Sequence, residues 1–576
     1  MSHITLGYDF GTESVRVIAV DVRDGAVLAQ SASSYDVIDE RLPASNLPLP
    51  PDYALQDPAG WLQAAWLATA ALKTQLATLT NSIVGIGLAF TSCTMLPCKA
   101  DGAPLCQAGF ADRALAWPKL WKHHGAKAET DLINKVARQR KEPWLDRYGG
   151  AIGLEWFFPK ILETFHRDRA VYDAAEVWLE AGDWLVWQLT GALTSDMTPV
   201  SERIREDPDF LHSAISAPKH PGVRQGARTP ASSFLVRSTC QAGYKAMWNA
   251  DTGFPSRDYF EAVSPGFGGV LDKLPGTFRS PGECAGLLSP AAAERLGLSP
   301  GIPVSTAIID AHAGVPGAGV AGDGTMVLVL GTSSCHMLNS RTEHVVPGVA
   351  GVVAGGILPG YFGYETGQAS VGDAFAWLVD RLNLSHAELT AGAEKLPPGA
   401  GGVLALDWLN GCRTPLMDGR LSGAFVGLTL GTTPAQLYRA MIEATAFGVR
   451  WIVDTLRDGG VPVERFVASG GLPDKSPLLM QIYADVLNDP ISLAESSQSV
   501  ALGAAILGAL AAGQSVTGHA TPEDAIRAMA RQRQSPVYLP DKAAHRRYQS
   551  VYRLYRELAN PDGTLAAVMR ELRERS

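Results

Sequence analysis

Two stretches of the 576-residue sequence combine glycine with threonine and serine as phosphate-binding loops do. One lies in GYDFGTESVRVIAV (residues 7–20) and the other in TMVLVLGTSSCHML (residues 325–338). Glycine lets backbone N–H groups approach phosphate oxygens closely, and hydroxyl groups add further donors. A single loop of this kind could equally be a plain glycine turn. Because the pattern occurs twice, it favours two loops that bind a polyphosphate from opposite sides. The residues expected to line the two loops are Gly11, Thr12 and Ser14, then Gly331, Thr332, Ser333 and Ser334.

Acidic residues and a second glycine pair stand beside predicted strand ends. Asp9 ends the first apolar run, where a carboxylate can hold a hydrated Mg²⁺ against phosphates. Asp310 ends the buried strand predicted in IPVSTAIIDAHAG, where it can accept a proton from a substrate hydroxyl that attacks a γ-phosphate. It is equally suited to be the N-cap of the segment that follows. Gly470 and Gly471 lie between a predicted strand and helix, where bare backbone leaves room for an adenine ring.

Two further positions carry polar groups among apolar neighbours. Lys245 lies in AGYKAMW and Glu365 in YETGQAS, and their aromatic and glycine-rich surroundings make them candidates for a binding site rather than ordinary surface charges. The pair His123-His124 suggests a metal, but no ligand partners accompany it at a suitable spacing. We therefore favour a solvated or hydrogen-bonded helix position for these histidines.

The elements that must position these residues form a weak internal repeat. Both halves open with two β-branched runs around a Gly-Thr/Ser tip, which predicts a β-hairpin and not the strand-to-helix turn of a P-loop. No GxxxxGK[ST] string occurs, and the GxGxxG string at Gly317, Gly319 and Gly322 runs almost directly into the strand TMVLVL, without room for a crossover helix. We take that string as the joint between a domain at residues 1–318 and a second at residues 319–576.

Composition narrows the class of protein. A net charge of −9 without a Lys/Arg block argues against nucleic-acid binding and against an anionic membrane surface. The apolar run VALGAAILGALAAG is too short and too rich in alanine and glycine to span a bilayer, and predicts a tightly packed core helix. The seven cysteines form no CxxC pair, which fits a reducing cytoplasm. Residues 195–236, rich in Pro, Ser and Arg, read as a long surface excursion of unassigned function.

The string DFGTESVR resembles the D-x-G-T-x-S-x-R opening of the FGGY carbohydrate kinases, and residues 423–443 are similar to that family's C-terminal signature. ALQDPAGW, IIDAHAG, LGTSS and ASGGLPDKSPLLMQIYADVL complete the family's order across essentially the whole chain. The resemblance implies an α/β fold of two actin-like (RNase H-like) ATPase domains with a catalytic cleft between them. It also implies that Asp310 is the catalytic base, with Ser92, Lys245 and Glu365 around the sugar. Thr91 and Cys93 remain alternatives to Ser92.

Longer strings are similar to the members of this family that act on L-ribulose: FTSCTMLP, LWKHH, RYGGAIGLEWFFPK and RSTCQAGYKAMW. The resemblance therefore implies transfer of a phosphoryl group from ATP to L-ribulose, giving L-ribulose 5-phosphate, in L-arabinose catabolism. ATP and Mg²⁺ are the expected cofactors. A kinase for D-ribulose, D-xylulose or ribitol, an actin-like or chaperone-like ATPase, and a catalytically silent sugar sensor are the alternatives. The sequence leaves open whether the chain forms a homodimer.

Overall fold

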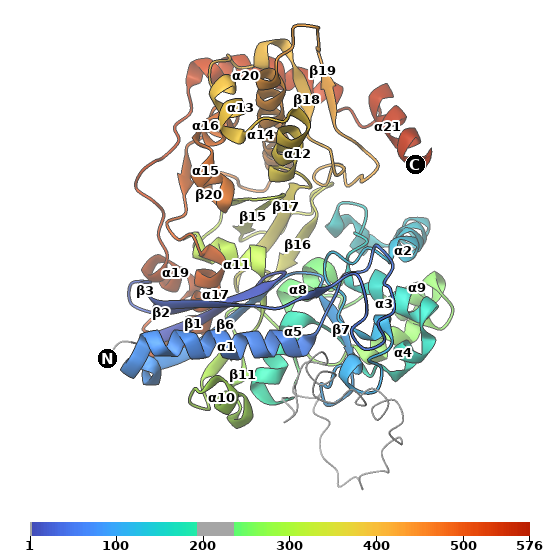
Figure 1. The fold of residues 1–576 in the computed structure, drawn as a ribbon, viewed down its shortest axis with the longest axis vertical. Helices are drawn as coiled ribbons and strands as arrows, with labels where there is room; N and C mark the ends of the chain where they lie inside the picture. The colour runs from blue at the N-terminus through green and yellow to red at the C-terminus, as the bar shows by residue number, and fades with distance from the viewer. Residues whose placement is uncertain (1–2, 193–234, 576) are drawn as a thin grey trace.

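The described elements of the protein form two α/β lobes, each built around one mixed sheet (Figure 1). The computed structural model describes residues 3–192 and 235–575. The excursion predicted at residues 195–236 therefore lies almost wholly outside the described residues. In Figure 1 the first half of the chain forms the lower lobe, and most of the second half forms the upper one.

The sheet of the first lobe begins with the hairpin that the sequence predicts. Strand β1 pairs antiparallel with β2, which pairs antiparallel with β3. On the other side of β1 lies parallel β6, which pairs in turn with parallel β12 and β13. The strands of this sheet are β1 (Ile4–Phe10), β2 (Ser14–Asp21), β3 (Val27–Ser34), β6 (Ile83–Phe90), β11 (Cys284–Leu287), β12 (Pro303–Ser305) and β13 (Ile308–Ile309).

The sheet of the second lobe repeats this arrangement. Strand β14 forms an antiparallel hairpin with β15, which pairs antiparallel with β17, and parallel β20 and β21 continue on the other side of β14. Two hairpins with the same neighbours on the same sides confirm the internal repeat. The strands of this sheet are β14 (Thr325–Leu330), β15 (Ser334–Ser340), β16 (Gly351–Ala354), β17 (Phe362–Gln368), β20 (Arg465–Ser469) and β21 (Ile491–Leu493).

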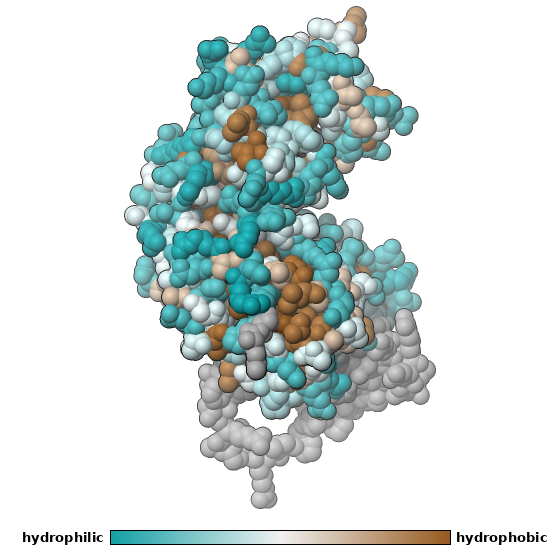
Figure 2. Space-filling view, turned by 90° about the vertical axis from the view of Figure 1, so that its left-hand side faces the viewer, coloured by the Kyte–Doolittle hydropathy of each residue, from teal (hydrophilic) through white to brown (hydrophobic). Residues whose placement is uncertain are grey.

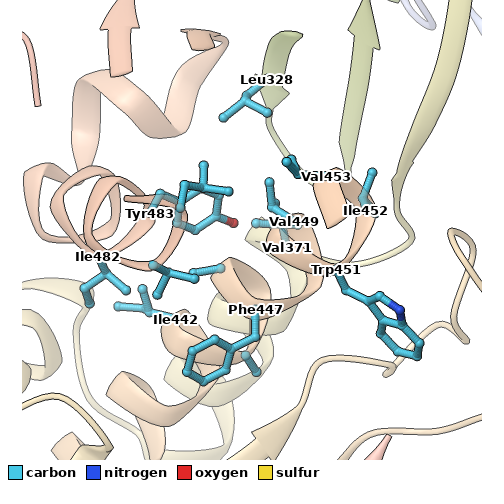
Figure 3. Packing of buried hydrophobic residues seen from close by; sticks show 14 of the residues in the cluster. Leu328, Val371, Ile442, Phe447, Val449, Trp451, Ile452, Val453, Ile482 and Tyr483 are labelled. Carbon is cyan, nitrogen blue, oxygen red and sulfur yellow. The ribbon is translucent and has the colours of Figure 1, made fainter. Parts of the chain in front are cut away.

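Parallel neighbours require a crossover, and long helices supply it in both lobes. Helix α1 (Pro58–Leu76) connects the first hairpin to β6; Asp57 caps it by accepting from the Ala59 N–H, with Pro58 in the first turn. Helix α14 (Pro434–Asp458) has the same place before β20, and begins with a capping box of Thr433 and Gln436. Figure 3 shows side chains of α14 packing with Tyr483 of α16 (Pro477–Leu487) and Leu328 of β14 in the core of the second lobe.

Helix α17 (Ser499–Ala512) belongs to the second half of the sequence but packs against the sheet of the first lobe. Figure 1 shows its red ribbon beside the blue strands β1 and β6. The approach is possible because the sheet presents glycines to a helix of small residues: a Cβ at Gly87 would lie 1.7 Å from the Ala504 carbonyl oxygen, and one at Gly7 would lie 2.0 Å from that of Ala501. This buried helix confirms the core helix predicted from VALGAAILGALAAG.

The glycine-rich joint is partly helical. Helix α11 (Asp310–Gly317) includes Gly317, the first glycine of the string taken as the joint, and residues 318–324 lead from the helix to β14. Gly317 packs so closely on α17 that a Cβ there would lie 1.7 Å from the Ser499 carbonyl oxygen. Two helices, α11 and α17, therefore connect the lobes.

Smaller elements complete both lobes. The other described helices of the first half are α2 (Lys127–Arg140), α3 (Phe157–Arg167), α4 (Arg169–Ala174), α5 (Ala181–Trp187), α8 (Thr239–Lys245), α9 (Arg257–Val263) and α10 (Pro290–Leu296). Those of the second half are α12 (Gly372–Leu382), α13 (His386–Ala393), α15 (Gly471–Lys475), α16 (Pro477–Leu487), α18 (Gln514–Thr517), α19 (Pro522–Met529), α20 (Lys542–Leu558) and α21 (Thr564–Arg575). Two-stranded sheets are formed by β4 (Val37–Ile38) with β5 (Leu55–Gln56), β7 (Met95–Cys98) with β8 (Val177–Glu180), β9 (Val236–Ser238) with β10 (Thr277–Arg279), and β18 (Leu404–Leu406) with β19 (Ala424–Val426).

Within the described ranges, no single helix is both long and apolar enough to cross a membrane, although Ser499–Ala512 and Gln514–Met529, bent by 107° to each other, pass that test as a pair.

Candidate active site

Parallel strands in register bring the predicted residues to one edge of each sheet. Phe10 of β1 and Ile309 of β13 are both aligned with Phe90 of β6. The residues that follow these three strand ends therefore emerge together, and they include the first loop and Asp310. In the second lobe Val329 of β14 is aligned with Ser469 of β20, so the second loop and the glycine pair also emerge side by side. Figure 2 shows that the surface is hollowed between the two lobes.

The carboxyl groups of Asp9 and Asp310 lie close enough to influence each other. Enclosure by the protein raises the pKa of Asp310 to about 7, and the negative charge of Asp9 adds to the rise. The backbone N–H of Ala311, 2.7 Å from Asp310 Oδ1, partly opposes it. Burial also raises the pKa of Asp9, while Arg16, whose Nη1 lies 3.1 Å from Asp9 Oδ2, opposes that shift. A carboxyl group with a pKa near neutrality is suited to accept a proton.

Asp310 is not the N-cap of the helix that follows it. Ile309 occupies the cap position, and Asp310 is the first residue of α11. Its one hydrogen bond to the described protein comes from the next residue along the chain, Ala311. The carboxylate is therefore left largely available to a ligand.

Lys245 and Glu365 come from different lobes and meet in a buried ion pair. The Lys245 Nζ lies 2.7 Å from Glu365 Oε1 and 2.9 Å from Oε2. Burial alone would raise the pKa of Glu365, but the charge of Lys245, with help from His312 and Arg413, lowers it to about 2. The Lys245 ammonium also lies 5.6 Å from the ring centroid of Trp156, over its face. Both side chains are therefore charged and fixed in place.

Ser92 belongs to a tight turn, Thr91–Thr94, that follows β6. The turn is closed by a 2.9 Å hydrogen bond between the Thr91 and Thr94 hydroxyls, and Cys93 adopts a left-handed φ of 57°. The buried Lys160 donates to the Cys93 carbonyl oxygen at 2.6 Å. The Ser92 side chain is partly exposed, whereas those of Thr91 and Cys93 are buried, which favours Ser92 as the residue of this turn that can reach a ligand.

Each hairpin tip is closed by a hydrogen bond from the N–H of its glycine, and the first tip is one residue longer than the second. The Gly11 N–H donates to the Ser14 carbonyl oxygen at 2.9 Å, and the Gly331 N–H donates to that of Ser333 at 3.0 Å. Thr12 is partly exposed, and Thr332 is exposed like Ser333. Ser334, in contrast, is buried: its hydroxyl lies 3.1 Å from His336 Nε2 and 3.3 Å from Gln368 Oε1, inside the second lobe.

The Gly470-Gly471 pair forms the predicted junction between a strand and a helix. Strand β20 ends at Ser469 and α15 begins at Gly471. Gly470 has a φ of 97°, and a Cβ at this position would lie 2.5 Å from the Leu330 carbonyl oxygen, so only glycine fits. A small pocket beside it is lined by residues that include Pro473 and Arg533.

Of the histidine pair, His123 packs inside the first lobe, whereas His124 is exposed. His123 is buried, and its Nε2 lies 2.7 Å from Glu163 Oε2; burial lowers its pKa to about 4. It lies in a turn and not in the expected helix. In the part of the chain that the structure describes, no three His, Cys, Asp or Glu side chains gather as a metal site would require.

Three side chains at this site were not predicted from the sequence. His312 lies with Nε2 3.4 Å from Glu365, and Arg413 donates to the Ser334 and Thr366 carbonyl oxygens at 3.1 and 3.3 Å. Lys160 lies within the apolar string EWFFPKIL. Like Lys245, it is a charged residue among apolar neighbours, and this pattern could have identified it from the sequence. Arg413 lies in an ordinary loop sequence that carries no such signal.

Comparison with known proteins matches both halves of the chain to one family. Models of the N-terminal and C-terminal domains of the FGGY family of carbohydrate kinases match residues 4–205 and 326–512. A ribulokinase from Shouchella clausii is 40% identical over 100% of this chain and 99% of its own length, and one from Halalkalibacterium halodurans is 40% identical over 96% and 93%. The fold is similar to that of a xylulose kinase from Rhodospirillum rubrum, with a TM-score of 0.75, 24% identity, and coverage of 98% of this chain and 100% of that one. These matches confirm the two-domain α/β fold of an FGGY kinase that was expected from the sequence.

Proposed function

The chain belongs to the FGGY family of carbohydrate kinases, and from that premise we propose that it transfers the γ-phosphoryl group of ATP to L-ribulose, giving L-ribulose 5-phosphate and ADP. The choice of sugar is supported by the names of relatives that align over essentially the full chain. The observation that carries the chemistry is the position of Asp310, a carboxyl group with a pKa raised to about 7 at the edge from which the first phosphate loop also emerges.

Each residue of the site has a part in this reaction. Asp310 accepts the proton of the attacking sugar hydroxyl as its oxygen bonds to the γ-phosphorus and the bond to the β-phosphate oxygen breaks. Lys245 donates hydrogen bonds to the ketose and Glu365 accepts them, while Ser92 adds a contact from the turn after β6. Because the reactants must be held in line, orientation alone can contribute about 7–11 kcal/mol to lowering the barrier.

The two hairpin tips hold the phosphates. Gly11, Thr12 and Ser14 would contact them from the first lobe, and Gly331, Thr332 and Ser333 from the second, through backbone N–H groups and hydroxyls. Gly470 and Gly471 lie at the strand end beside the second tip, where the bare backbone accommodates the adenine. Closing the two lobes on the sugar would exclude water and so protect ATP from hydrolysis.

Asp9 fits the role of the Mg²⁺ ligand. Its carboxylate is buried at the end of β1, immediately before the first tip, and one of its oxygens is bonded to Arg16 while the other has no partner among the described residues. A single carboxylate with phosphate oxygens and water is the usual way in which proteins hold Mg²⁺ beside a nucleotide. The ion would neutralise charge on the phosphates.

The parts of the active site are divided between the two halves of the chain. Residues 1–318 would supply the sugar site, the first phosphate loop and the catalytic base, and residues 319–576 the second loop and the adenosine site. Helix α17 is an exception in packing, since it lies on the sheet of the first lobe.

A coupled assay of ADP release tests the proposal. L-Ribulose is compared with D-ribulose, D-xylulose, ribitol, glycerol and a control without sugar. We expect the highest kcat/KM for L-ribulose, and ADP release without sugar at a much lower rate. Preference for another sugar would refute the proposed substrate, and sugar-independent hydrolysis would indicate an ATPase.

The base is tested by Asp310→Asn. We expect turnover to fall by about 10²–10⁴-fold because the amide cannot accept the proton, with ATP and sugar binding retained in calorimetry. Asp131→Asn, at an exposed position on α2, is the matched control. Near-normal turnover of the Asp310 variant would reject the assignment.

A further inference from the structure

Every carbonyl group in the first hairpin tip is held by a donor from the protein. The Gly11 oxygen accepts from the Tyr35 hydroxyl at 2.5 Å, and the Thr12 oxygen accepts from Gln56 Nε2 at 2.6 Å. The Glu13 oxygen accepts from the Tyr35 backbone N–H at 3.0 Å, and the Ser14 oxygen from the Gly11 N–H at 2.9 Å. No carbonyl oxygen of this loop is therefore left to face an anion.

Two side chains from outside the hairpin supply these contacts. Tyr35 is buried just after β3, and its hydroxyl also lies 3.2 Å from the Ser14 carbonyl oxygen. Gln56 is 1% exposed and is itself held in place, because its Oε1 accepts from the indole N–H of the buried Trp61 at 3.1 Å. That bond fixes which end of the Gln56 carboxamide points at the loop.

The backbone amides of the same tip are free. The N–H groups of Thr12 and Glu13 lie between the two strands of the hairpin and donate to no acceptor in the described protein. A loop with its carbonyl oxygens turned inward and its N–H groups unpaired is a concave site for an anion. The donors that hold the carbonyls thus determine which way the free amides point.

The second tip has the same design with different donors. The Gly331 oxygen accepts from the Gly372 N–H at 3.0 Å, and the Thr332 oxygen accepts from those of Val371 and Asp373 at 3.0 and 3.1 Å. All three donors are backbone groups at the start of α12. At the first tip, two carbonyl groups are instead held by the side chains of Tyr35 and Gln56, and Gln56 lies two residues before the start of α1.

We propose that Tyr35 and Gln56 are positioning residues for phosphoryl transfer: they hold the carbonyl groups of the first loop away from the nucleotide, so that the Thr12 and Glu13 amides meet its phosphates. This inference rests on the proposed kinase function and deepens it. Preorganised donors act strongly because they need not reorient during the reaction. Neither residue touches the reacting atoms, so their effect is confined to nucleotide affinity and turnover.

Two substitutions that each remove one donor test the proposal. Tyr35→Phe removes only the hydroxyl, and Gln56→Met keeps the length of the side chain but removes its donor. We expect each to lower kcat/KM for ATP by about tenfold or more, in line with other groups that orient a site, while KM for the sugar changes by less than about twofold. Tyr259→Phe is the matched control, because its buried hydroxyl donates to the Ile133 carbonyl oxygen at 3.0 Å far along the same lobe.

The substitution Gln56→Glu should make kcat/KM for ATP depend on pH, which would not be expected if Gln56 had a purely structural role. The carboxylate still accepts from Trp61 but repels the Thr12 oxygen, and only its protonated form can donate to that oxygen. Burial raises the pKa of such a group. We therefore expect kcat/KM for ATP, taken as a ratio to the wild type at each pH, to recover as the pH falls from 8 to 6.

The outcomes separate this inference from the function on which it rests. ATP binding to the wild type and the variants is also measured by calorimetry without sugar. A wild type that binds ATP but phosphorylates no sugar refutes the proposed function, while the ATP affinities of the variants still report on the loop. An active wild type whose Tyr35 and Gln56 variants keep normal ATP constants, or lose sugar and ATP affinity equally, overturns the inference.

Discussion

Replacing Lys245 by methionine is expected to destabilise the protein as well as to impair sugar binding. The methionine is similar in length but leaves the Glu365 carboxylate buried without its cation. The two side chains meet across the lobes at 2.7 and 2.9 Å, and both are almost fully shielded from solvent. The free energy lost is therefore large compared with that of a surface ion pair.

The pKa shift of Glu365 gives the size of the expected loss in the free energy of unfolding. Burial favours the protonated acid, and the neighbouring cations outweigh it and lower the pKa from 4.5 to about 2. At about 1.4 kcal/mol for each pH unit, this corresponds to about 3 kcal/mol of stability. Because the pKa is depressed in the folded state, the contribution is complete above pH 4.5 and is lost as the pH falls towards 2. A loss of about 3–5 kcal/mol is typical when one partner of a buried pair is removed.

A double-mutant cycle in urea unfolding at pH 7 measures this interaction. Lys245→Met should lower the free energy of unfolding by about 3–5 kcal/mol, and the double variant with Glu365→Gln should recover much of that loss because no unpaired buried charge remains. If the effects of the two single substitutions simply add within about 0.5 kcal/mol, the two side chains are not coupled and the expected contribution of the ion pair to stability is refuted.

Three further predictions follow from buried groups. For the wild type, kcat/KM should fall by about tenfold for each pH unit below about 7, because protonated Asp310 cannot accept a proton; a flat profile from pH 5.5 to 7 would contradict its role as the base. Burial raises the pKa of Glu180 to about 8, so its ionisation opposes folding increasingly as the pH rises from 4.5 to 8. Glu180→Gln should accordingly raise the urea midpoint at pH 9 but not at pH 4.5, and an equal effect at both would show that charge is not the cause. Gly87→Ala should lower stability by at least about 1–3 kcal/mol, since its Cβ would lie 1.7 Å from the Ala504 oxygen, whereas Gly269→Ala, which meets nothing within 4 Å, should leave the melting temperature nearly unchanged.

The sequence predicted those parts of the site that local patterns encode. The two hairpins were visible because β-branched runs around a Gly-Thr/Ser tip have a meaning within about fifteen residues. Asp310 was a candidate because it ends a buried strand, and the glycine pair at residues 470–471 because it separates a strand from a helix. These features depend on neighbours in the chain and need no knowledge of the rest of the fold.

Other parts of the site were predicted as isolated residues and not as an arrangement. Lys245 and Glu365 each stood out from their apolar neighbours, but their ion pair joins positions 120 residues apart in different lobes. Arg413 and Tyr35 gave no signal, because their roles consist of hydrogen bonds to carbonyl groups that lie far away in the sequence. Because the backbone carbonyl group is chemically the same in every residue, the sequence does not show from which donor a given carbonyl oxygen will accept a hydrogen bond.

The repeated hairpins, the family resemblance and the identity of the chemical groups could therefore all be recognised from the amino-acid sequence. The packing of α17 on the first sheet, the pKa of Asp310 near 7 and the donors that orient the first loop became evident from the folded structure alone. The difference lies in how far apart in the sequence the interacting residues are. Strand periodicity and turn geometry depend on adjacent residues. Burial, electrostatic coupling and hydrogen bonds between distant segments arise only when the chain has packed.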